Sequence, residues 1–536
     1  MTPKDESIQI QIARLADANE DVRREASHAL YEMCRDSGEE VRAAITALVE
    51  CLGDPDKKVR ESAEWALSYC GSSALMRLVG CLSSENRLVR LHAVRSIGNK
   101  HDEGIGAKDQ LRKLLADEDS EIRENAARTL GIIGDKDERT LVGLRAMANS
   151  ATASDRSAAL HALGNLAPRI EDEAKLHGWL IHVTEAVQDE DDGVRWSAFF
   201  LLRAIKVAPA ASLPLWTRGL DDPDAEVADM AVCGLIELGE ETDISAAVPA
   251  LSRLVERDDR SSKSACEALK AIGNNAKAAV TTLLGALKSK DPFLVTRAAE
   301  ALWQIDRRAE ESLPALANLL EEGEPGVVEG MCDVVHFLGP AAAPLTKPVL
   351  NVLANEDWDL KWAAADALGS IASPDPNVIS ALIVALGHKG GRVSPAAAHA
   401  LAAIGQSAIP ALVQVLVEEG DDDRRGWAAD VLGHIGPKAK VALKPLAMLL
   451  RHENPELRAW CAIALGKIGR LKEIVPILIR ILENRNPRGL RYQAAEALGS
   501  IGAGARRAIP TLKKLLRDED EEIRAAVKAA IAKIQG

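Results

Sequence analysis

Apolar and polar residues recur along this chain with a period of about 33 residues. The pattern is clearest in residues 457–469, where apolar side chains occupy the first position and then the positions 4, 7, 8 and 11 residues later. This spacing places them on one face of an α-helix. The same pattern occurs 33 residues earlier, at 424–436, and 33 residues later, at 490–502. A fixed period of this length predicts a solenoid of stacked helical repeats.

Sixteen copies of the pattern can be aligned along the chain. If the residue that opens each copy is offset 0, eleven of the fifteen steps between copies lie within one residue of 33. The opening residues are Val22, Val59, Val89, Ile122, Asp155, Val194, Val227, Ser261, Leu294, Val327, Leu360, Val393, Arg424, Leu457, Leu490 and Ile523. We therefore expect an all-α fold, a right-handed α-solenoid of about sixteen helical hairpins, that runs through residues 1–536 as a single continuous domain.

The residues around each copy predict where its helices start and end. Alanine is common at offsets 4 and 7, where a small side chain lets a neighbouring helix come close. Glycine at offset 12 is expected to end the first helix in a left-handed conformation, and a second helix and an acidic turn follow. That glycine is present in nine copies, as Gly71, Gly134, Gly239, Gly273, Gly339, Gly405, Gly436, Gly469 and Gly502.

The repeated pattern, Val/Leu-Arg-x-x-Ala-x-x-Ala-Leu-Gly-x-Ile-Gly, resembles the HEAT-repeat family, in the short-repeat branch named after phycobilisome lyase subunits. The resemblance covers essentially the whole chain. It implies a scaffold that binds a protein or peptide partner, with the first helix of each copy lining an inner concave surface. It also implies an alternative, a phycobilin lyase or isomerase-like subunit or another enzyme-associated protein, in which a bilin would be the ligand.

The presence or absence of an arginine at offset 1 divides the repeats into three groups. Ten copies have it, and the six that lack it are consecutive. We expect less regular copies at residues 1–206, middle copies without the arginine at 207–405, and regular copies at 406–536. In similar repeats this arginine pairs with turn acids of an adjoining copy, because its planar guanidinium suits a carboxylate. The middle copies are therefore expected to have fewer polar ties and to be softer or differently curved.

Offsets 2, 6 and 10 of the first helix point away from its apolar face and are predicted to form rows along a partner-binding groove. Early copies have basic or aromatic residues there, which would contact an acidic or polar segment, and later copies have acids, which would face a basic one. Tryptophan is a frequent interface anchor. The early candidates are His28, Trp65, Tyr69, Arg95, Asn99, Arg128, His161 and Trp196. The later ones are Glu267, Glu300, Asp333, Asp366 and Asp430, with Trp362, Trp427 and Trp460 as further anchors. The alternative is an ordinary solvated surface whose charges pair with neighbours.

Composition narrows the class of partner and the compartment. The net charge of −14 disfavours nucleic acid and anionic lipid. No uninterrupted apolar run approaches membrane-spanning length, and residues 1–6 lack the basic start and apolar stretch of a signal peptide. The eight cysteines form no Cys-x-x-Cys pair, so reduced and packed thiols are expected. These features favour a cytoplasmic protein of bacterial type.

No catalytic or metal site is predicted, and an interaction protein is favoured over an enzyme. The one adjacent His-Glu pair, His452-Glu453, falls in a turn, and the other histidines are dispersed. Metal ligands have to converge within bonding distance, so we expect no metal and no cofactor. The acidic runs at 189–192 and 421–423 could suggest calcium, but they precede first helices, where acids cap the helix and match its dipole.

Overall fold

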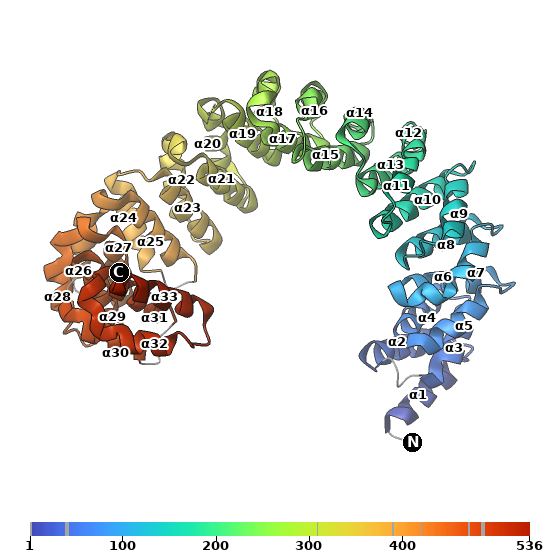
Figure 1. The fold of residues 1–536 in the computed structure, drawn as a ribbon, viewed down its shortest axis with the longest axis horizontal. Coiled ribbons are helices and arrows are strands. Elements are labelled where there is room, and N and C mark those ends of the chain that lie inside the picture. The colour runs from blue at the N-terminus through green and yellow to red at the C-terminus, as the bar shows by residue number, and fades with distance from the viewer. Residues whose placement is uncertain are drawn as a thin grey trace. The chain divides into compact units, whose positions relative to one another are not determined.

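The computed structural model of the chain consists of helices arranged in two layers (Figure 1). It describes residues 3–37, 42–307, 309–388, 391–418, 420–469, 472–483 and 488–536, and these contain no strand. The helices form two compact units, Met1–Ile272 and Gly273–Gly536. The boundary falls inside the eighth copy, directly after its first helix. The divisions expected at residues 206 and 405 stay predictions.

The helices that carry the repeated pattern, which we call A helices, form one layer of unit 1 (Figure 1). Each packs on the A helices of the neighbouring copies, so the layer is continuous within the unit. The A helices of unit 1 are α2 (Glu20–Ser37), α4 (Lys57–Tyr69), α6 (Arg87–Gly98), α8 (Ser120–Ile132), α10 (Ala153–Leu166), α13 (Asp192–Ile205), α15 (Ala225–Gly239) and α17 (Arg260–Ile272).

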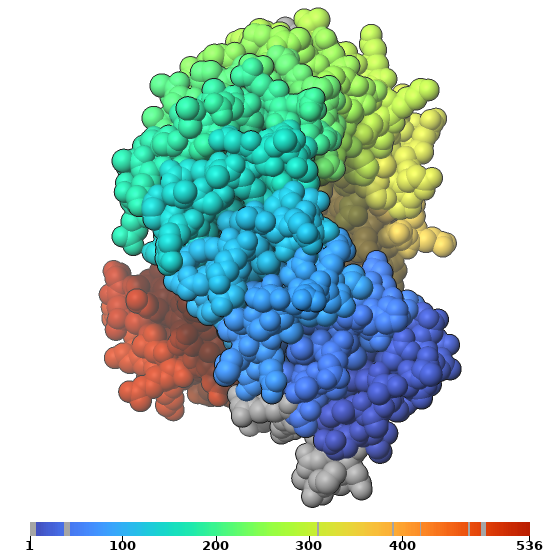
Figure 2. All heavy atoms as spheres, turned by 90° about the vertical axis from the view of Figure 1, so that its right-hand side faces the viewer, coloured from blue at the N-terminus to red at the C-terminus, as the bar shows by residue number. Residues whose placement is uncertain are grey.

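The second layer of unit 1 consists of shorter helices between successive A helices, which we call B helices. Several follow a short 3-10 turn that carries the chain from one layer to the other. They are α1 (Pro3–Arg14), η1 (Arg42–Ala44), α3 (Ile45–Cys51), α5 (Gly71–Cys81), η2 (His101–Ala107), α7 (Lys108–Leu114), α9 (Glu138–Met147), η3 (Ala167–Arg169), α11 (Glu173–Gly178), α12 (Leu180–Ala186), α14 (Pro209–Gly219), η4 (Ser245–Ala247) and α16 (Val248–Val255). In Figure 2 the visible face of unit 1 passes from blue to green in chain order.

Unit 2 has the same two layers. Its A helices are α19 (Pro292–Asp306), α21 (Pro325–Leu338), α23 (Trp358–Ile371), α25 (Val393–Ile404), α27 (Asp422–Ile435), α29 (Pro455–Gly469), α31 (Arg488–Ile501) and α33 (Glu521–Gln535). Its B elements are η5 (Gly273–Ala279), α18 (Val280–Ala286), α20 (Ala309–Glu322), η6 (Gly339–Leu345), α22 (Thr346–Leu353), α24 (Pro376–Leu386), η7 (Gly405–Ala408), α26 (Ile409–Val417), η8 (Gly436–Ala442), α28 (Leu443–Leu449), η9 (Lys472–Ile474), α30 (Val475–Glu483), η10 (Gly502–Ala508) and α32 (Ile509–Leu515).

Each of the sixteen predicted opening residues lies in its own A helix, so the count of copies agrees with the described helices. The B helix α1 precedes the first A helix.

Small residues set how closely successive A helices stack. A Cβ atom added at Gly131 of α8 would lie 2.9 Å from Cα of Ala162 in α10, which is closer than such atoms come in proteins. The same approach occurs between Gly433 and Ala464, at 3.2 Å. In both pairs a glycine at offset 9 faces an alanine at offset 7 of the next copy. Close packing at these points leaves no room for a larger residue.

Seven of the nine glycines at offset 12 have a positive φ, as expected for the end of a helix. Gly405 and Gly436 combine φ of +71° with ψ of −124° and −141°, a conformation that only glycine adopts readily. The expectation is wrong for Gly239 and Gly469, which are the last residues of α15 and α29 and do not have a positive φ.

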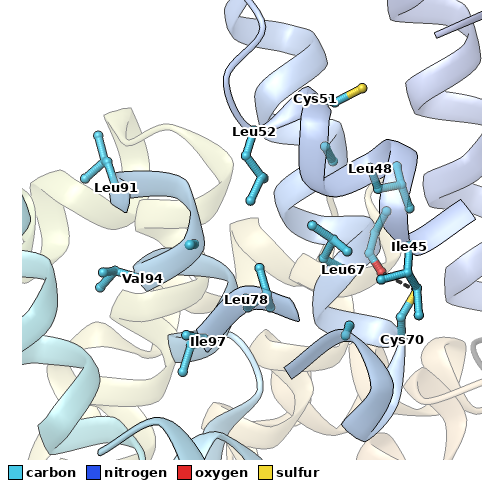
Figure 3. Close-up of a cluster of buried hydrophobic side chains, with 14 of the residues drawn as sticks. Ile45, Leu48, Cys51, Leu52, Leu67, Cys70, Leu78, Leu91, Val94 and Ile97 are labelled. Carbon is cyan, nitrogen blue, oxygen red and sulfur yellow. Dashed lines mark hydrogen bonds between the residues drawn. The ribbon is translucent and has the colours of Figure 1, made fainter. Parts of the chain in front are cut away.

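The apolar face of each A helix packs against its B helices. Figure 3 shows this core in the early copies, where Leu48, Leu67, Leu78 and Ile97 are completely buried. Because each copy contacts mainly its neighbours, the core is a long series of small clusters.

Several of the offset-1 arginines tie successive turns together. Nη1 of Arg90 donates to the main-chain oxygens of Ser84 and Glu85, at 2.9 and 3.2 Å, and Nε donates to Asp117 in the next turn, at 3.0 Å. The other arginines that reach an aspartate of the next turn form the pairs Arg23–Asp54, Arg156–Asp189, Arg195–Asp222 and Arg491–Asp518. A single guanidinium therefore closes its own turn and binds the next one.

One of the copies without this arginine has a substitute. Arg257, which precedes the eighth copy, donates to the main-chain oxygens of Asp222 and Pro223. These oxygens lie six and five residues before Ala228, the offset-1 residue of the seventh copy, so an arginine at 228 would reach the same two. The expectation of fewer polar ties is therefore wrong for the turn of the seventh copy.

One stretch among the described residues, Val393–Val417, is long and apolar enough to cross a membrane by length and composition. It is not an uninterrupted apolar run, because Ser394, His399 and Gln406 fall within it. The structure divides the stretch into α25 and α26, with Gly405 at φ +71° between them, and both helices pack on α27.

Candidate partner-binding groove

The early candidate residues fall into two groups on the A layer of unit 1. In the first group, the His28 ring stacks on Tyr31 with centroids 5.8 Å apart, and Tyr31 contacts Tyr69 at 6.2 Å. Trp65 and Tyr69 are 48% and 43% exposed. This group presents aromatic surface on α2 and α4.

Two of the early candidates are held by side chains of the solenoid. Arg95 donates to Glu121 at 2.8 Å and to Asn125 at 3.3 Å. Asn99 reaches Glu64 at 3.5 Å, and Glu64 is itself buried and bonded to His92 at 2.8 Å. Arg95 and Asn99 therefore take part in the packing between copies, which supports the solvated-surface interpretation at these two positions.

The second group is a stack of three rings on α10 and α13. The His161 and Phe200 rings are 4.6 Å apart and 10° from parallel, and those of Trp196 and Phe200 are 5.7 Å apart and 6° from parallel. Such near-parallel rings are favourable beyond the area they bury. Gly164 makes room for the stack, because a Cβ atom there would lie 2.6 Å from the Phe200 ring.

A cavity of about 440 Å³ opens beside this stack, within unit 1. His161 and Trp196 line it together with Arg128, so three predicted residues share one site. The remaining lining residues were not predicted from the sequence; they are Ser157, Asp192, Gly193, Ser197, Asp224, Glu226 and Val227. Their positions carry a signal that could have found them, because most of them stand within three residues of the start of an A helix.

The cavity has charges of opposite sign. Arg128 is exposed, and no hydrogen bond or ion pair of its side chain is found among the described residues. Asp192, Asp224 and Glu226 supply carboxylates to the same cavity. Burial and the nearby charge of Arg128 lower the pKa of His161 below its usual value. His161 is therefore held neutral at pH 7, where its ring presents a flat face and one hydrogen-bond donor.

A second cavity, of about 500 Å³, lies between the sixth and seventh copies. Its lining includes Trp216, Arg203 and Glu237, and Arg203 forms an ion pair with Glu237 there. None of the predicted groove residues lines it. The sequence gives no repeated feature at this place, so the cavity could not be anticipated.

The predicted acidic row is only partly exposed. Asp333, which is exposed, and Asp366, which is half-buried, lie on neighbouring helices of unit 2. Nδ1 of His336 is 2.7 Å from the Asp366 carboxylate. Burial, Asp366 and Glu300 raise the pKa of Asp333, although His336 opposes them. Glu267 is half-buried on α17 of unit 1.

The expectation that offset 6 is always exposed is wrong for Glu300 and Asp430, which are 9% and 6% exposed. Glu300 lies 3.3 Å from Arg297. Asp430 lies 3.3 Å from His434 on the same helix, and this contact raises the pKa of His434. Close stacking covers these carboxylates, so neither presents an open binding face.

The late tryptophans, all half-buried, are covered by neighbouring groups. Arg392 lies over the Trp362 ring, 3.5 Å from its centroid. Trp427 and Trp460 pack on each other with centroids 5.8 Å apart, beside a smaller cavity of about 150 Å³. These contacts stabilise neighbouring copies and leave less free ring surface than at Trp65.

The described residues contain no group of three or more His, Cys, Asp or Glu that could hold a metal ion. The acidic runs cap helices, as Asp191 and Asp421 show by accepting hydrogen bonds from main-chain N–H groups at the starts of α13 and α27. All eight cysteines are free thiols. Cys233 is exposed, so the expectation of packed thiols is wrong at that position.

The repeated helices match a known family. The profile described as HEAT repeats matches residues 75–164, 346–433 and 443–532, which together make up half of the chain. The chain belongs to the HEAT-repeat family. No curated protein sequence matches this HEAT-repeat chain.

Solved structures similar to this HEAT-repeat protein are karyopherins. A crystal structure of importin beta aligns with a TM-score of 0.64 at 15% identity, covering 98% of this chain and 82% of that one. Kap95 in a complex with Nup1 aligns with a TM-score of 0.54 at 16% identity, over 99% and 82% of the two chains. Kap121p bound to Pho4p gives 0.51 at 15% identity, over 99% and 69%. At these identities the likeness shows the fold, an all-α solenoid.

Proposed function

We propose that this HEAT-repeat chain is a protein-binding scaffold, and that the cavity beside the ring stack of unit 1 binds a segment of its partner. The observation that carries the proposal is that His161 and Trp196, held nearly parallel by Phe200, line a cavity together with Arg128. Rigid aromatic rings beside a concavity are the usual anchors of protein interfaces. The similar structures of Kap95 with Nup1 and Kap121p with Pho4p show that this fold can hold protein partners.

The charges of the cavity define the segment that fits it. A carboxylate of the partner would meet Arg128, and a flat or apolar side chain would lie on Trp196. A basic side chain would meet the carboxylates of Asp192 and Glu226. We therefore infer a short peptide segment with charges of both signs, and not nucleic acid, because three carboxylates line the cavity. The free thiols support a cytoplasmic location as part of this proposal.

Partner capture from the native host tests the proposal. The chain carrying Trp196→Ala with Arg128→Glu is compared with the unchanged chain and with Trp303→Ala, a matched control that removes another half-buried tryptophan, in α19. We expect the double substitution to weaken binding of one specific protein by roughly 30-fold or more, as truncation of an interface tryptophan does. The control variant is expected to bind that protein as well as the unchanged chain does. If the doubly substituted chain captured the same partners as the unchanged chain, the proposal that this cavity binds the partner would be contradicted.

The resemblance to the phycobilisome-lyase branch leaves a bilin-handling subunit as the alternative proposal. The cavity beside Trp196 is the feature that could hold a flat ligand. Mixing the chain with a bilin and recording its absorbance tests this alternative directly. A change in the absorbance spectrum that Trp196→Ala abolishes would favour the bilin-handling subunit. An unchanged spectrum would favour the protein-binding scaffold.

A further inference from the structure

Two buried thiols touch at the ends of the first two A helices. Cys34 lies near the end of α2, and Cys70 directly follows α4. Their Sγ atoms are 3.4 Å apart, and the two residues are 1% and 3% exposed. A disulfide bond is about 2.05 Å long, so the sulfur atoms would have to approach by only about 1.4 Å. Figure 3 shows Cys70 inside the apolar cluster.

A buried lysine is held next to this pair. Nζ of Lys100, a residue that is 5% exposed, donates to the main-chain oxygens of Ser68 and Gly71, at 3.0 and 3.1 Å. These oxygens lie on either side of Cys70 in the sequence. An ammonium group has three donors, so the two carbonyls do not use all of them. A cation held beside a thiol favours the reactive thiolate form.

The two sulfur atoms differ in acidity, and Cys70 also differs from the other buried thiols. The hydrogen bond with Cys34 and the charge of Lys100 lower the pKa of Cys70, although burial opposes them. The hydrogen bond with Cys70 and burial raise the pKa of Cys34. Burial raises the pKa of Cys51 and of Cys461 to about 12, so these two thiols stay protonated at neutral pH. Cys70 is therefore the nucleophile of the pair, and Cys34 is placed to resolve its oxidised form.

We propose that Cys34 and Cys70 are a peroxide-sensitive site that closes to a reversible disulfide. The Cys70 thiolate attacks one oxygen of hydrogen peroxide, so that an S–O bond forms, the O–O bond breaks and hydroxide leaves as water after taking a proton. Sulfur of Cys34 then loses its proton and attacks sulfur of Cys70. The S–S bond forms, the S–O bond breaks and a second water leaves. The balance is two thiols and one peroxide to one disulfide and two waters, and a dithiol reverses it.

The disulfide would clamp the first two copies. It joins residues 36 positions apart, and a cross-link that closes a loop of this length restricts the unfolded chain. Trp65 and Tyr69 lie on α4, one to five residues before Cys70, so the bond would also fix this helix against α2, where Tyr31 contacts Tyr69. Peroxide reaches the buried pair when the first two copies open locally, because elements of a folded protein open transiently.

Peptide mapping of the full chain tests the proposal. The chain is treated with hydrogen peroxide, unfolded, alkylated at the remaining thiols, digested and analysed by mass spectrometry without reduction. We expect a peptide that joins Cys34 to Cys70, lost after dithiothreitol and absent from Cys34→Ala and from Cys70→Ala. The matched control is Cys51→Ser, which removes a buried thiol of the same core and is expected to form the cross-link at an unchanged rate.

The pH dependence of the oxidation separates a chemical role of Lys100 from a structural one. In Lys100→Met, we expect the midpoint of the rate profile to move to higher pH and the rate at pH 7 to fall roughly tenfold, as a pKa shift of about one unit requires. An unchanged profile would overturn the assignment of Cys70 as the nucleophile. Sulfinic acid on Cys70 without the cross-linked peptide, or cross-links through other cysteines instead, would overturn the proposal.

Discussion

Arg123 binds the carboxylate of Asp155, a residue that stands where nearly all other copies have an apolar opening residue. Nη2 and Nε of Arg123 lie 2.8 and 3.0 Å from Oδ2 of Asp155. In other copies this arginine reaches an aspartate five positions before the opening residue, and that position is Ser150 here. The Ser150 hydroxyl donates to the same carboxylate, at 3.0 Å. The acid has therefore moved from the turn to the helix, and the bridge between the copies is kept.

Replacement of Asp155 by valine restores the common residue of the repeat, yet we expect it to destabilise the solenoid. Asp155 is 2% exposed, and its loss leaves the half-buried Arg123 guanidinium without its carboxylate. A lost partner of this kind costs about 1–3 kcal/mol. Hydrogen exchange measured by mass spectrometry should show faster exchange at α8 and α10 than in the unchanged chain.

A second substitution separates the bridge from packing at the same site. Ser150→Asp, added to Asp155→Val, puts the carboxylate back at the turn position that Asp117 and Asp189 occupy in their copies. We expect it to recover most of the lost protection. If Asp155→Val alone were as protected as the unchanged chain, the bridge would have no measurable role.

Two glycine-to-alanine changes in A helices are expected to have opposite effects on stability, because only one of the glycines lies where successive A helices stack closely. Gly131→Ala would place a methyl group 2.9 Å from Cα of Ala162 and is expected to cost about 1–3 kcal/mol through overpacking. Gly330→Ala, in α21, meets nothing within 4 Å and should stabilise its helix by about 0.5–1 kcal/mol. Thermal unfolding of the two variants compares them. Equal changes of the same sign in the melting temperature would contradict the role of glycine in close helix stacking.

Arg257 is expected to protect the turn of the seventh copy. Arg257→Gln removes its bonds to the oxygens of Asp222 and Pro223, so amides at the start of α15 should exchange faster. Ala228→Arg in the same variant restores an arginine at the usual offset and should slow the exchange again. The same data compare the middle copies with their flanks, and equal protection throughout would contradict the predicted softer centre.

The pKa of His161 is expected to lie below about 6.5, the usual value for histidine. Burial lowers it first and Arg128 lowers it further, so Arg128→Gln should raise it. Because the folded-state pKa is depressed, the stabilisation it reflects is present above about pH 6.5 and is lost as pH falls. NMR titration of the histidines measures the pKa of His161 in the unchanged chain and in Arg128→Gln. His434, whose pKa Asp430 raises, serves as the internal control. A value for His161 above that for His434 would contradict this electrostatic picture.

The sequence was sufficient to predict the architecture because each copy repeats the same pattern of buried and exposed positions. Apolar residues at offsets 0, 4, 7, 8 and 11 place one face of every A helix in the core, and sixteen such helices are found among the described residues. The arginine at offset 1 was predicted to pair with an adjoining turn, and Arg90 does so with Asp117. Periodicity is reliable where the environment of a position is the same in every copy.

Departures from the repeat were not predictable in the same way. Arg60 reaches His92 at 3.1 Å because the usual turn acid of the next copy is Ser84, and only the structure shows which side chain compensates. Asp430 shares offset 6 with exposed residues, yet close stacking covers it. The candidate cavity needed residues from four successive copies at once, including turn acids that sequence analysis treated as helix caps.

The most direct test of the account is site-specific photo-cross-linking in the native host. A photoreactive phenylalanine analogue is placed at Trp196, on the A layer beside the cavity, and separately at Met76, which is 78% exposed on the B helix α5. The account predicts one dominant cross-linked protein from position 196, lost when Arg128→Glu is added, and no such product from position 76. Cross-linking of the same protein from position 76 and none from position 196 would contradict a partner-binding groove on the A layer.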